Sequence, residues 1–242
     1  MIENLPDAIT QVVTDMQAES VSSRDHTAND SSFTYNYITE NNIFVAGMYV
    51  EILPTFENVR YKIDTFTKNS RNSYTITFVG DFSILEGSDG SIEIRPFILF
   101  KYDSYKNIQK RILEESKGTV TKNNKYPLLV LAMPYKETRE RENEIIFETV
   151  VSMALIIDSQ KHYTTAERLT YSFKQKLHPL YNLFIDKLKL CGLFQMDENY
   201  NIPHEKEDLY FWSADPAQTQ NKISAIVDAI EINNLQLILN KQ

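Results

Sequence analysis

The first apolar pattern along the chain is helical. Over residues 5–19 the apolar side chains recur at i, i+4, i+7, i+8 and i+11, as Leu5, Ile9, Val12, Val13 and Met16. With 3.6 residues per turn, this spacing places them on one face, so the segment is predicted to form an amphipathic helix. The polar stretch 18–32 that follows has no such period and is predicted to be a mobile loop.

Residues 33–103 are predicted to be rich in β-strands. Apolar and polar residues alternate most clearly in three runs, at 59–64, 74–78 and 92–95. Such alternation is typical of antiparallel strands that have one buried and one polar face. Turn-forming residues separate the runs at 68–72 and 87–90. A second helix is expected at about 104–116.

Two strongly apolar runs, Leu128–Met133 and Ile145–Ile157, are predicted to pair as a central β-hairpin. The residues between them, 136–144, are almost all charged and would form the tip of this hairpin. Two interpretations of the tip stay open: a solvated loop, or an arm that contacts a neighbouring subunit.

A long helix is predicted to begin at Thr164, because Thr164 and Glu167 have the spacing of a capping box. Behind it, apolar side chains recur every three or four residues, at Leu169, Phe173, Leu177, Leu180, Phe184 and Leu188. Since this phase continues through Pro179, we expect one long helix kinked there or two coaxial helices. Gly192 is the expected cap at the end of the helix.

The last strand is predicted at 226–239, and its apolar residues change sides in the middle. Ile230 and Ile232 have one parity, whereas Leu235, Leu237 and Leu239 have the other. A β-bulge at Asn233–Asn234 would return all of them to one face. The fold class predicted from these elements is α+β: an antiparallel or mixed sheet packed against the N-terminal helix and the long kinked helix.

Composition narrows the class of protein. Hydrophobic residues make up 42 % of the 242 residues and aromatic residues 12 %, which is enough to build a core. No apolar run approaches the roughly 20 residues that cross a bilayer. No secretory signal is recognisable, and Cys191 is the only cysteine, so neither an internal disulfide nor a membrane association is expected.

The charge distribution disfavours binding to nucleic acids. The net charge is −8, and residues 1–46 alone hold seven acidic residues against one arginine, which gives −6. An acidic chain lacks the basic surface that grips phosphates, so no specific nucleic-acid binding is expected. The few glycines are scattered and do not form a phosphate-binding loop.

Motifs of catalysis and metal binding are weak in this sequence. None of the four histidines has the i, i+4 spacing of a helical zinc site. The group His204, Glu205 and Asp208 is interpreted as a solvated acidic loop before a strand, and His178 as a capping or packing residue. Cys191 is expected to be a small buried thiol. We therefore predict no enzyme activity, no cofactor and no metal; a small hydrolase that uses Cys191 or His178 is the enzymatic alternative.

Three segments carry a family resemblance: 125–131 (KYPLLVL), 177–184 (LHPLYNLF) and 228–235 (DAIEINNL). Together they resemble virion proteins of tailed bacteriophages and prophages from Bacteroides-type hosts, a group that includes crAss-like phages. The order of elements is also similar to tail-terminator and tail-completion (neck) proteins. The resemblance covers roughly residues 1–20 and 120–242. It implies a core formed by 1–54 and 105–242, with a β-rich insertion at 55–104.

The resemblance implies a mechanical function. Such proteins form homo-oligomeric rings between portal and tail, in virions assembled in the host cytoplasm, and they contact portal, neck or tail components. Subunit contacts are expected in the β-rich region and the charged tip, at Arg60, Lys62, Glu93, Arg95, Lys136, Arg139 and Arg141. The acidic N-terminal segment would become ordered when a partner docks. The alternative from another class is a monomeric, phage-encoded adaptor.

Overall fold

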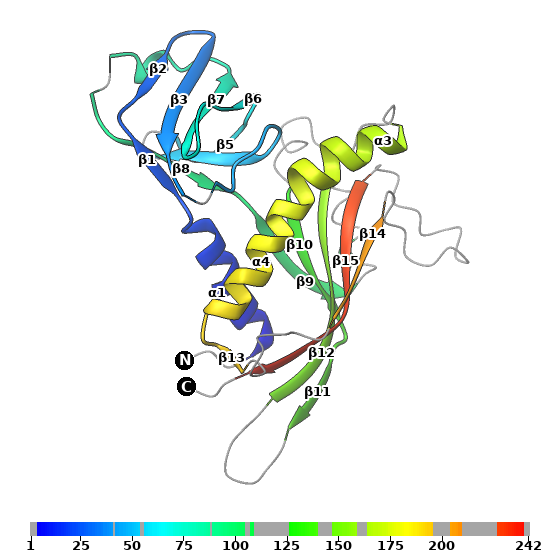
Figure 1. Cartoon of the computed structure of the whole chain (residues 1–242). Helices are drawn as coiled ribbons and strands as arrows, with labels where there is room; N and C mark the ends of the chain where they lie inside the picture. The colour runs from blue at the N-terminus through cyan, green and yellow to red at the C-terminus, as the bar shows by residue number, and fades with distance from the viewer. Residues whose placement is uncertain are drawn as a thin grey trace. The chain divides into compact units, whose positions relative to one another are not determined.

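The computed structural model describes residues 4–40, 42–53, 56–87, 89–104, 107–108, 126–139, 147–158, 164–195, 204–209 and 227–239 (Figure 1). The chain divides into two compact units: Met1–Asp15 with Ile98–Gln242, which we call the sheet unit, and Met16–Phe97, which we call the barrel unit. The fold class is α+β, as predicted. Three antiparallel or mixed sheets occur together with an N-terminal helix and a long helix. Among the described residues, no helix is long and apolar enough to span a membrane.

Helix α1 (Leu5–Gln17) confirms the predicted amphipathic helix. The side-chain oxygen of Asn4 accepts a hydrogen bond from the backbone N–H of Asp7 at 2.9 Å, which satisfies one of the free donors of the first turn. All five apolar residues that defined the pattern are buried. The sequence period therefore identified the face by which this helix packs.

The barrel unit contains two four-stranded antiparallel sheets, with the orders β1-β8-β4-β5 and β2-β3-β7-β6. The strands are β1 (Val21–Ser23), β2 (His26–Ala28), β3 (Ser32–Ile38), β4 (Tyr49–Leu53), β5 (Phe56–Lys62), β6 (Thr65–Lys68), β7 (Ser73–Val79) and β8 (Ile92–Pro96). Two residues separate β1 from β2, and two separate β5 from β6. At each of these corners the chain passes from one sheet to the other, so the sheets join into a barrel.

One prediction for this unit was wrong. Residues 18–32 were expected to be a loop, but they contain β1 and β2, which pair with β8 and β3. Each strand has only three residues, which is too short for an alternating pattern to be visible. The partner of β1, strand β8, lies about 70 residues away in the sequence, so tertiary contacts decide the structure there, whereas β2 pairs with the adjacent β3.

Aromatic side chains fill the barrel. They line β3 and β7 and continue into the turn after β7; Tyr37 stacks on Tyr74 with ring centroids 5.5 Å apart, and Phe33 on Phe78 with ring centroids 5.7 Å apart. The Tyr35 hydroxyl lies 2.9 Å from the carbonyl oxygen of Val21 and 2.8 Å from that of Ile92, so it bridges β1 and β8. Burial raises the pKa of Tyr35 well above its ordinary value, which keeps the hydroxyl protonated and able to donate.

The sheet unit is built on one mixed sheet with the order β13-β15-β12-β10-β9; β11 also pairs with β12, and β14 with β15. The strands are β9 (Leu99–Ser104), β10 (Leu128–Met133), β11 (Lys136–Arg139), β12 (Phe147–Asp158), β13 (Phe194–Gln195), β14 (Glu205–Leu209) and β15 (Val227–Leu239). The predicted hairpin is confirmed, because β10 and β12 are antiparallel neighbours. Residues 128–132 are buried on both faces of the sheet, which explains their unbroken apolar sequence.

The predicted bulge is also confirmed. In the pairing of β12 with β15, Met153 faces Ile232 and Val151 faces Leu235, so Asn233 and Asn234 together oppose Ser152. Asn234 has a φ of 53°, a left-handed conformation that asparagine tolerates better than most residues. The bulge keeps the apolar residues of both halves of β15 on one face.

The long helix consists of α3 (Thr165–Glu167), a π-helical segment η2 (Arg168–Leu177) and α4 (His178–Leu190), joined without a break. The capping box at Thr164 is present, and Gly192 has the left-handed φ of 68° expected for the cap. Pro179 lies in the first turn of α4, where the winding changes from π to α. One expectation fails: Leu169 is 40 % exposed, because the wider π-turn buries Arg168 and Ser172 in its place.

Several predicted boundaries can be placed on the structure. The boundary between residues 54 and 55 falls between β4 and β5, which are paired in one sheet of the barrel unit. Of the helix expected at about 104–116, the structure describes Ser104, which ends β9, and residues 107–108, which are helical. The tip residues 136–139 form β11, and the remaining tip residues lie outside the described part of the chain.

Candidate contact surfaces and functional site

Two of the predicted contact residues in the barrel unit, Arg60 and Arg95, have internal partners. The Arg95 guanidinium binds the nearly buried carboxylate of Glu51, at 2.8 Å from Nε and 2.6 Å from a terminal nitrogen. The Arg60 guanidinium lies 3.5 Å from the centre of the Phe97 ring. Burial lowers the pKa of Arg60, whereas the nearby Glu51 acts in the opposite direction. Glu51 lies opposite Arg60 on β5 and opposite Arg95 on β8, so the three residues form a row across neighbouring strands.

The other predicted contact residues are spread over both units. Lys62 is exposed at the end of β5, and Glu93 is half-buried on β8. Lys136 and Arg139 begin and end β11 in the sheet unit. Arg141 lies outside the described residues. Within the barrel unit, the structure brings Arg60 and Arg95 together on either side of Glu51.

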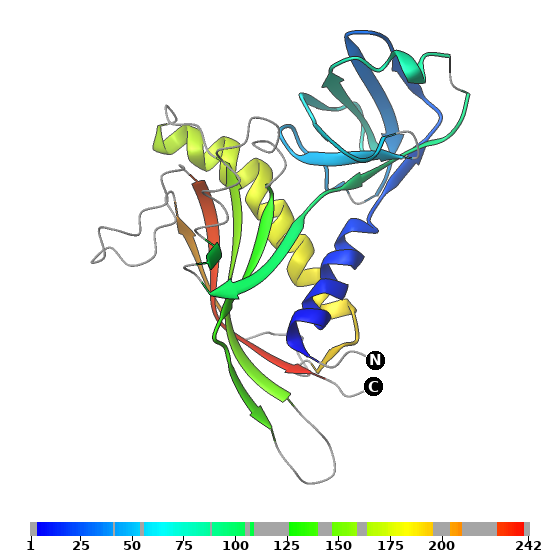
Figure 2. The ribbon, with the colours of Figure 1, turned by 180° about the vertical axis from the view of Figure 1, so that it is seen from behind.

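The end of the central sheet is a candidate contact surface. Strand β12 has 12 residues and β10 has 6, and the first four residues of β12 pair with β11 instead of β10. Figures 1 and 2 both show β11, β12 and β15 continuing past β9 and β10. On this segment, Leu235 and Leu237 of β15 are buried, whereas the neighbouring Val150 is 40 % exposed. We call β11, residues 147–150 and residues 235–239 the sheet end.

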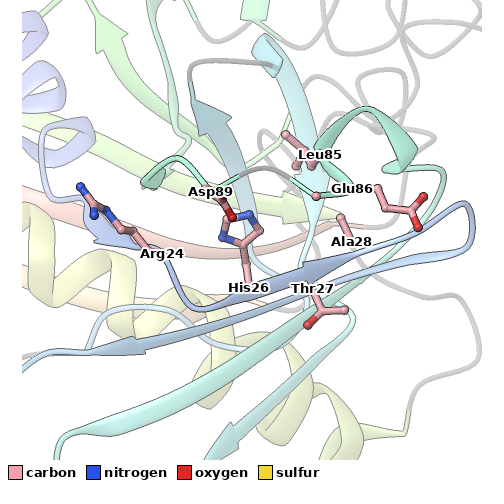
Figure 3. A pocket seen from close by; sticks show the side chains of 8 residues that line it. Arg24, His26, Thr27, Ala28, Leu85, Glu86 and Asp89 are labelled. Carbon is pink, nitrogen blue, oxygen red and sulfur yellow. The ribbon is translucent and has the colours of Figure 1, made fainter.

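A pocket of about 480 Å³ lies on the barrel unit (Figure 3). It is lined by β2 and by the segment around 85–89: Arg24, His26, Thr27, Ala28, Leu85, Glu86, Gly87 and Asp89. Ala28 and Leu85 are buried and apolar, whereas Glu86 and Asp89 are exposed. Figure 3 draws these side chains, which come from β2, from Arg24 just before it and from the segment around 85–89. The Nδ1 atom of His26 is buried and has no hydrogen-bond partner among the described residues.

A polar cluster connects the long helix to β14. His178 Nε2 lies 3.3 Å from Asp208 Oδ2, and the Lys206 ammonium lies 3.6 Å from the other oxygen of Asp208. Tyr181 is hydrogen-bonded to His204, and burial, aided by the charge of Asp208, raises the pKa of the Tyr181 hydroxyl. The segment expected to be a loop before a strand is thus β14 itself. The cluster holds this strand to the helix by side-chain contacts at the margin of the core.

Cys191 offers little chemistry. The Cys191 thiol is half-buried and donates a hydrogen bond to the carbonyl oxygen of Leu188 at 3.2 Å. Burial raises the pKa of this thiol, which disfavours the reactive thiolate. Within the described ranges, no group of three or more His, Cys, Asp or Glu side chains is placed to hold a metal ion.

No protein-family model, no curated protein and no solved structure matches the chain.

Proposed function

We propose that this chain is a structural virion protein that assembles with copies of itself into a ring in the head–tail connector or tail of a tailed bacteriophage. The observation that carries the proposal is the sheet end, which continues past β9 and β10 as a segment with two different faces (Figure 2). One face packs Leu235 and Leu237 into the core, and the other presents Val150. A protruding, partly apolar sheet segment is suited to subunit contact.

The strand order supports this assignment. Among the described residues, β11 pairs with β12 on one side only, and in the proposed ring its other edge pairs with a neighbouring copy. The sequence of β11, Lys-Glu-Thr-Arg, contains three charged residues. Charged edge strands resist unspecific aggregation and still permit pairing with a complementary partner. Strand β11 can therefore discriminate between a complementary partner strand and other strands.

Ring closure requires two different surfaces on each subunit. A contact that joins one face to a different face of the next copy produces a ring when the rotation closes. The chain has two compact units with separate cores, and each unit offers its own surface to a neighbour. This arrangement supports a heterologous contact between copies.

The assignment to phages comes from the sequence resemblance. The described parts of the three segments that carry the resemblance all belong to the sheet unit. The described parts of the three resembling segments lie in β10, at the start of α4 and in β15. They form part of the frame of the sheet unit. The proposal therefore includes no enzyme activity, no cofactor and no specific nucleic-acid binding, with portal, neck or tail proteins as partners.

The test is the mass of the purified chain, measured by light scattering, with negative-stain images of the same fraction. We expect a multiple of the 28.2 kDa chain mass and ring-shaped particles. A monomer at every concentration, alone and with candidate portal and tail proteins, would contradict the proposal. If one phage protein binds the monomer without a ring, the adaptor function is favoured instead.

A further inference from the structure

The segment η2 carries apolar residues spaced for an α-helix, but it is wound as a π-helix. In an α-helix, at about 100° per residue, Leu169 would lie about 80° from Leu177, and Arg168 about 180° from it. The structure instead buries both Arg168 and Leu177, at 6 % and 0 % exposure, and leaves Leu169 40 % exposed. The wider π-turn, with its i→i+5 hydrogen bonds, brings Arg168 and Leu177 onto the same side.

The π winding leaves two buried polar atoms unsatisfied. Ser172 Oγ and Asp228 Oδ2 have no hydrogen-bond partner among the described residues, and their residues are 1 % and 0 % exposed. Such atoms are costly to bury, so the winding needs a compensating interaction. The Arg168 guanidinium supplies it, because it binds the other oxygen of Asp228 at 2.8 Å.

We propose that η2 is a switch between two helical registers, held π-wound by the Arg168–Asp228 ion pair. When this pair is broken, the segment rewinds as an α-helix. Leu169 then turns inward beside Phe173, and Arg168 turns out to the solvent. The sequence supports this second register, because the apolar stripe of α4 continues through Leu177 and Phe173 to Leu169 at spacings of four residues. The inference does not depend on ring formation.

The two registers present different surfaces at the beginning of the long helix. In the π register this surface includes the apolar side chain of Leu169, whereas in the α register it includes the charged side chain of Arg168. A ligand shifts such an equilibrium by binding one state better than the other. An acidic partner that pairs with the exposed Arg168 would therefore favour the α register.

The charge of Asp228 opposes the rewinding in the unchanged chain. In the α register this fully buried carboxylate loses its counter-charge, which is unfavourable in an apolar interior. The variant Asp228→Asn removes the charge and with it this opposition. In the same variant the π register buries the Arg168 guanidinium without a counter-charge, so the balance moves toward the α register.

The test follows a thiol whose exposure differs between the two registers. In a Cys191→Ser background, Thr170→Cys supplies this thiol, since residue 170 is exposed in the structure. In an α-helix, residue 170 would lie seven residues, or about two turns, from the buried Leu177 and on the same face. Asn182→Cys, at an exposed position of α4, is the matched control. Alkylation rates are measured in each background, and circular dichroism checks the folding.

Asp228→Asn should slow the alkylation at position 170 at least about tenfold, because the thiol then reacts only while the π register is populated. The rate at position 182 should stay the same. Adding Leu169→Glu should restore the fast rate at 170. The charged side chain is tolerated where Leu169 is exposed, in the π register, and is costly on the buried face of the α register.

A second variant, Ser172→Leu, tests the same switch without touching the strand. The larger side chain does not fit at the fully buried Ser172 of the π register, so it should protect the thiol at 170 as Asp228→Asn does. Unchanged or faster alkylation at 170 in both variants would overturn the inference, as would protection that Leu169→Glu does not reverse. Loss of the helical signal in both variants would also overturn it, because the α register would then not be accessible.

Discussion

The two units of this protein bury their apolar residues in different ways. In the barrel unit, β3 and β7 bury alternate positions, and large aromatic rings fill the space between the two sheets. In the sheet unit, residues 128–132 are buried at every position, because both faces of the sheet are covered. The comparison shows that alternation identifies a sheet with one packed face, whereas an unbroken apolar run identifies a strand in the middle of a layered core.

The units also differ in how they bury charge. Asp228 of β15 is completely buried and accepts a hydrogen bond from Arg168 at 2.8 Å. In the barrel, Glu51 is nearly buried, but its partner Arg95 retains 34 % of its side-chain exposure. If one member of the Glu51–Arg95 pair is removed, water can therefore solvate the charged group that is left. Water cannot do this at the completely buried Asp228.

The largest expected effect tests whether the two cores are independent. Phe33→Ala removes a fully buried ring from the barrel and should lower the stability of that unit by about 4 kcal/mol. Phe184→Ala is the matched change in the long helix. Hydrogen exchange should show faster opening in 21–96 for the first variant, and in the sheet unit for the second. Equal loss of protection in both units after either change would show that they unfold as one.

The buried ion pair should be the next most sensitive feature. Asp228→Asn removes the negative charge that the buried Arg168 guanidinium faces at 2.8 Å and should destabilise the protein by about 3 kcal/mol in urea unfolding. The double change Arg168→Met/Asp228→Leu should recover most of this loss, because no charge is left buried. Glu51→Gln in the barrel, at the better-solvated pair, should cost about 1 kcal/mol. An equal cost at both sites would contradict the difference in burial.

The capping box at the start of the long helix gives a smaller, pH-dependent effect. Hydrogen bonds from the Thr164 backbone and hydroxyl lower the pKa of Glu167. Its contribution is thus fully present above the ordinary pKa of glutamate, and is lost as the pH falls through the lowered folded value. Thr164→Ala should destabilise by about 1 kcal/mol at neutral pH. The difference between the two proteins in thermal unfolding should shrink at acid pH; a constant difference would exclude the proposed linkage.

The smallest effect is expected at the bulge. Asn234 has a positive φ, so Asn234→Gly should change the stability by less than about 0.5 kcal/mol. Asn234→Val, whose branched side chain disfavours this conformation, should cost about 1–2 kcal/mol. Urea unfolding of the two variants provides the comparison. Tolerance of valine would mean that the strand had moved to a different register.

The sequence predicted those features that local patterns determine. The face of α1 followed from its period, and the bulge followed from the change of parity between Ile232 and Leu235. The capping box followed from the spacing of Thr164 and Glu167. In each case the deciding residues are close together along the chain.

Features that depend on distant residues were missed. The partner of Arg95 is 44 positions away, and the pocket joins residues 24–28 to 85–89. No local pattern indicates such pairs. Leu169 was placed on the buried face because the period of an α-helix was assumed, and the π-winding of η2 changes that period. The short strands β1 and β2 were missed because three residues cannot show an alternation.

The position of β15 inside the sheet has a consequence for synthesis on the ribosome. This strand pairs with β12 on one side and with β13 and β14 on the other, and it ends at Leu239. The sheet unit therefore cannot close until the ribosome has translated Leu239. The barrel unit needs nothing beyond Phe97. At about 5–20 residues per second, the barrel unit therefore has on the order of ten seconds to fold before the sheet unit is complete.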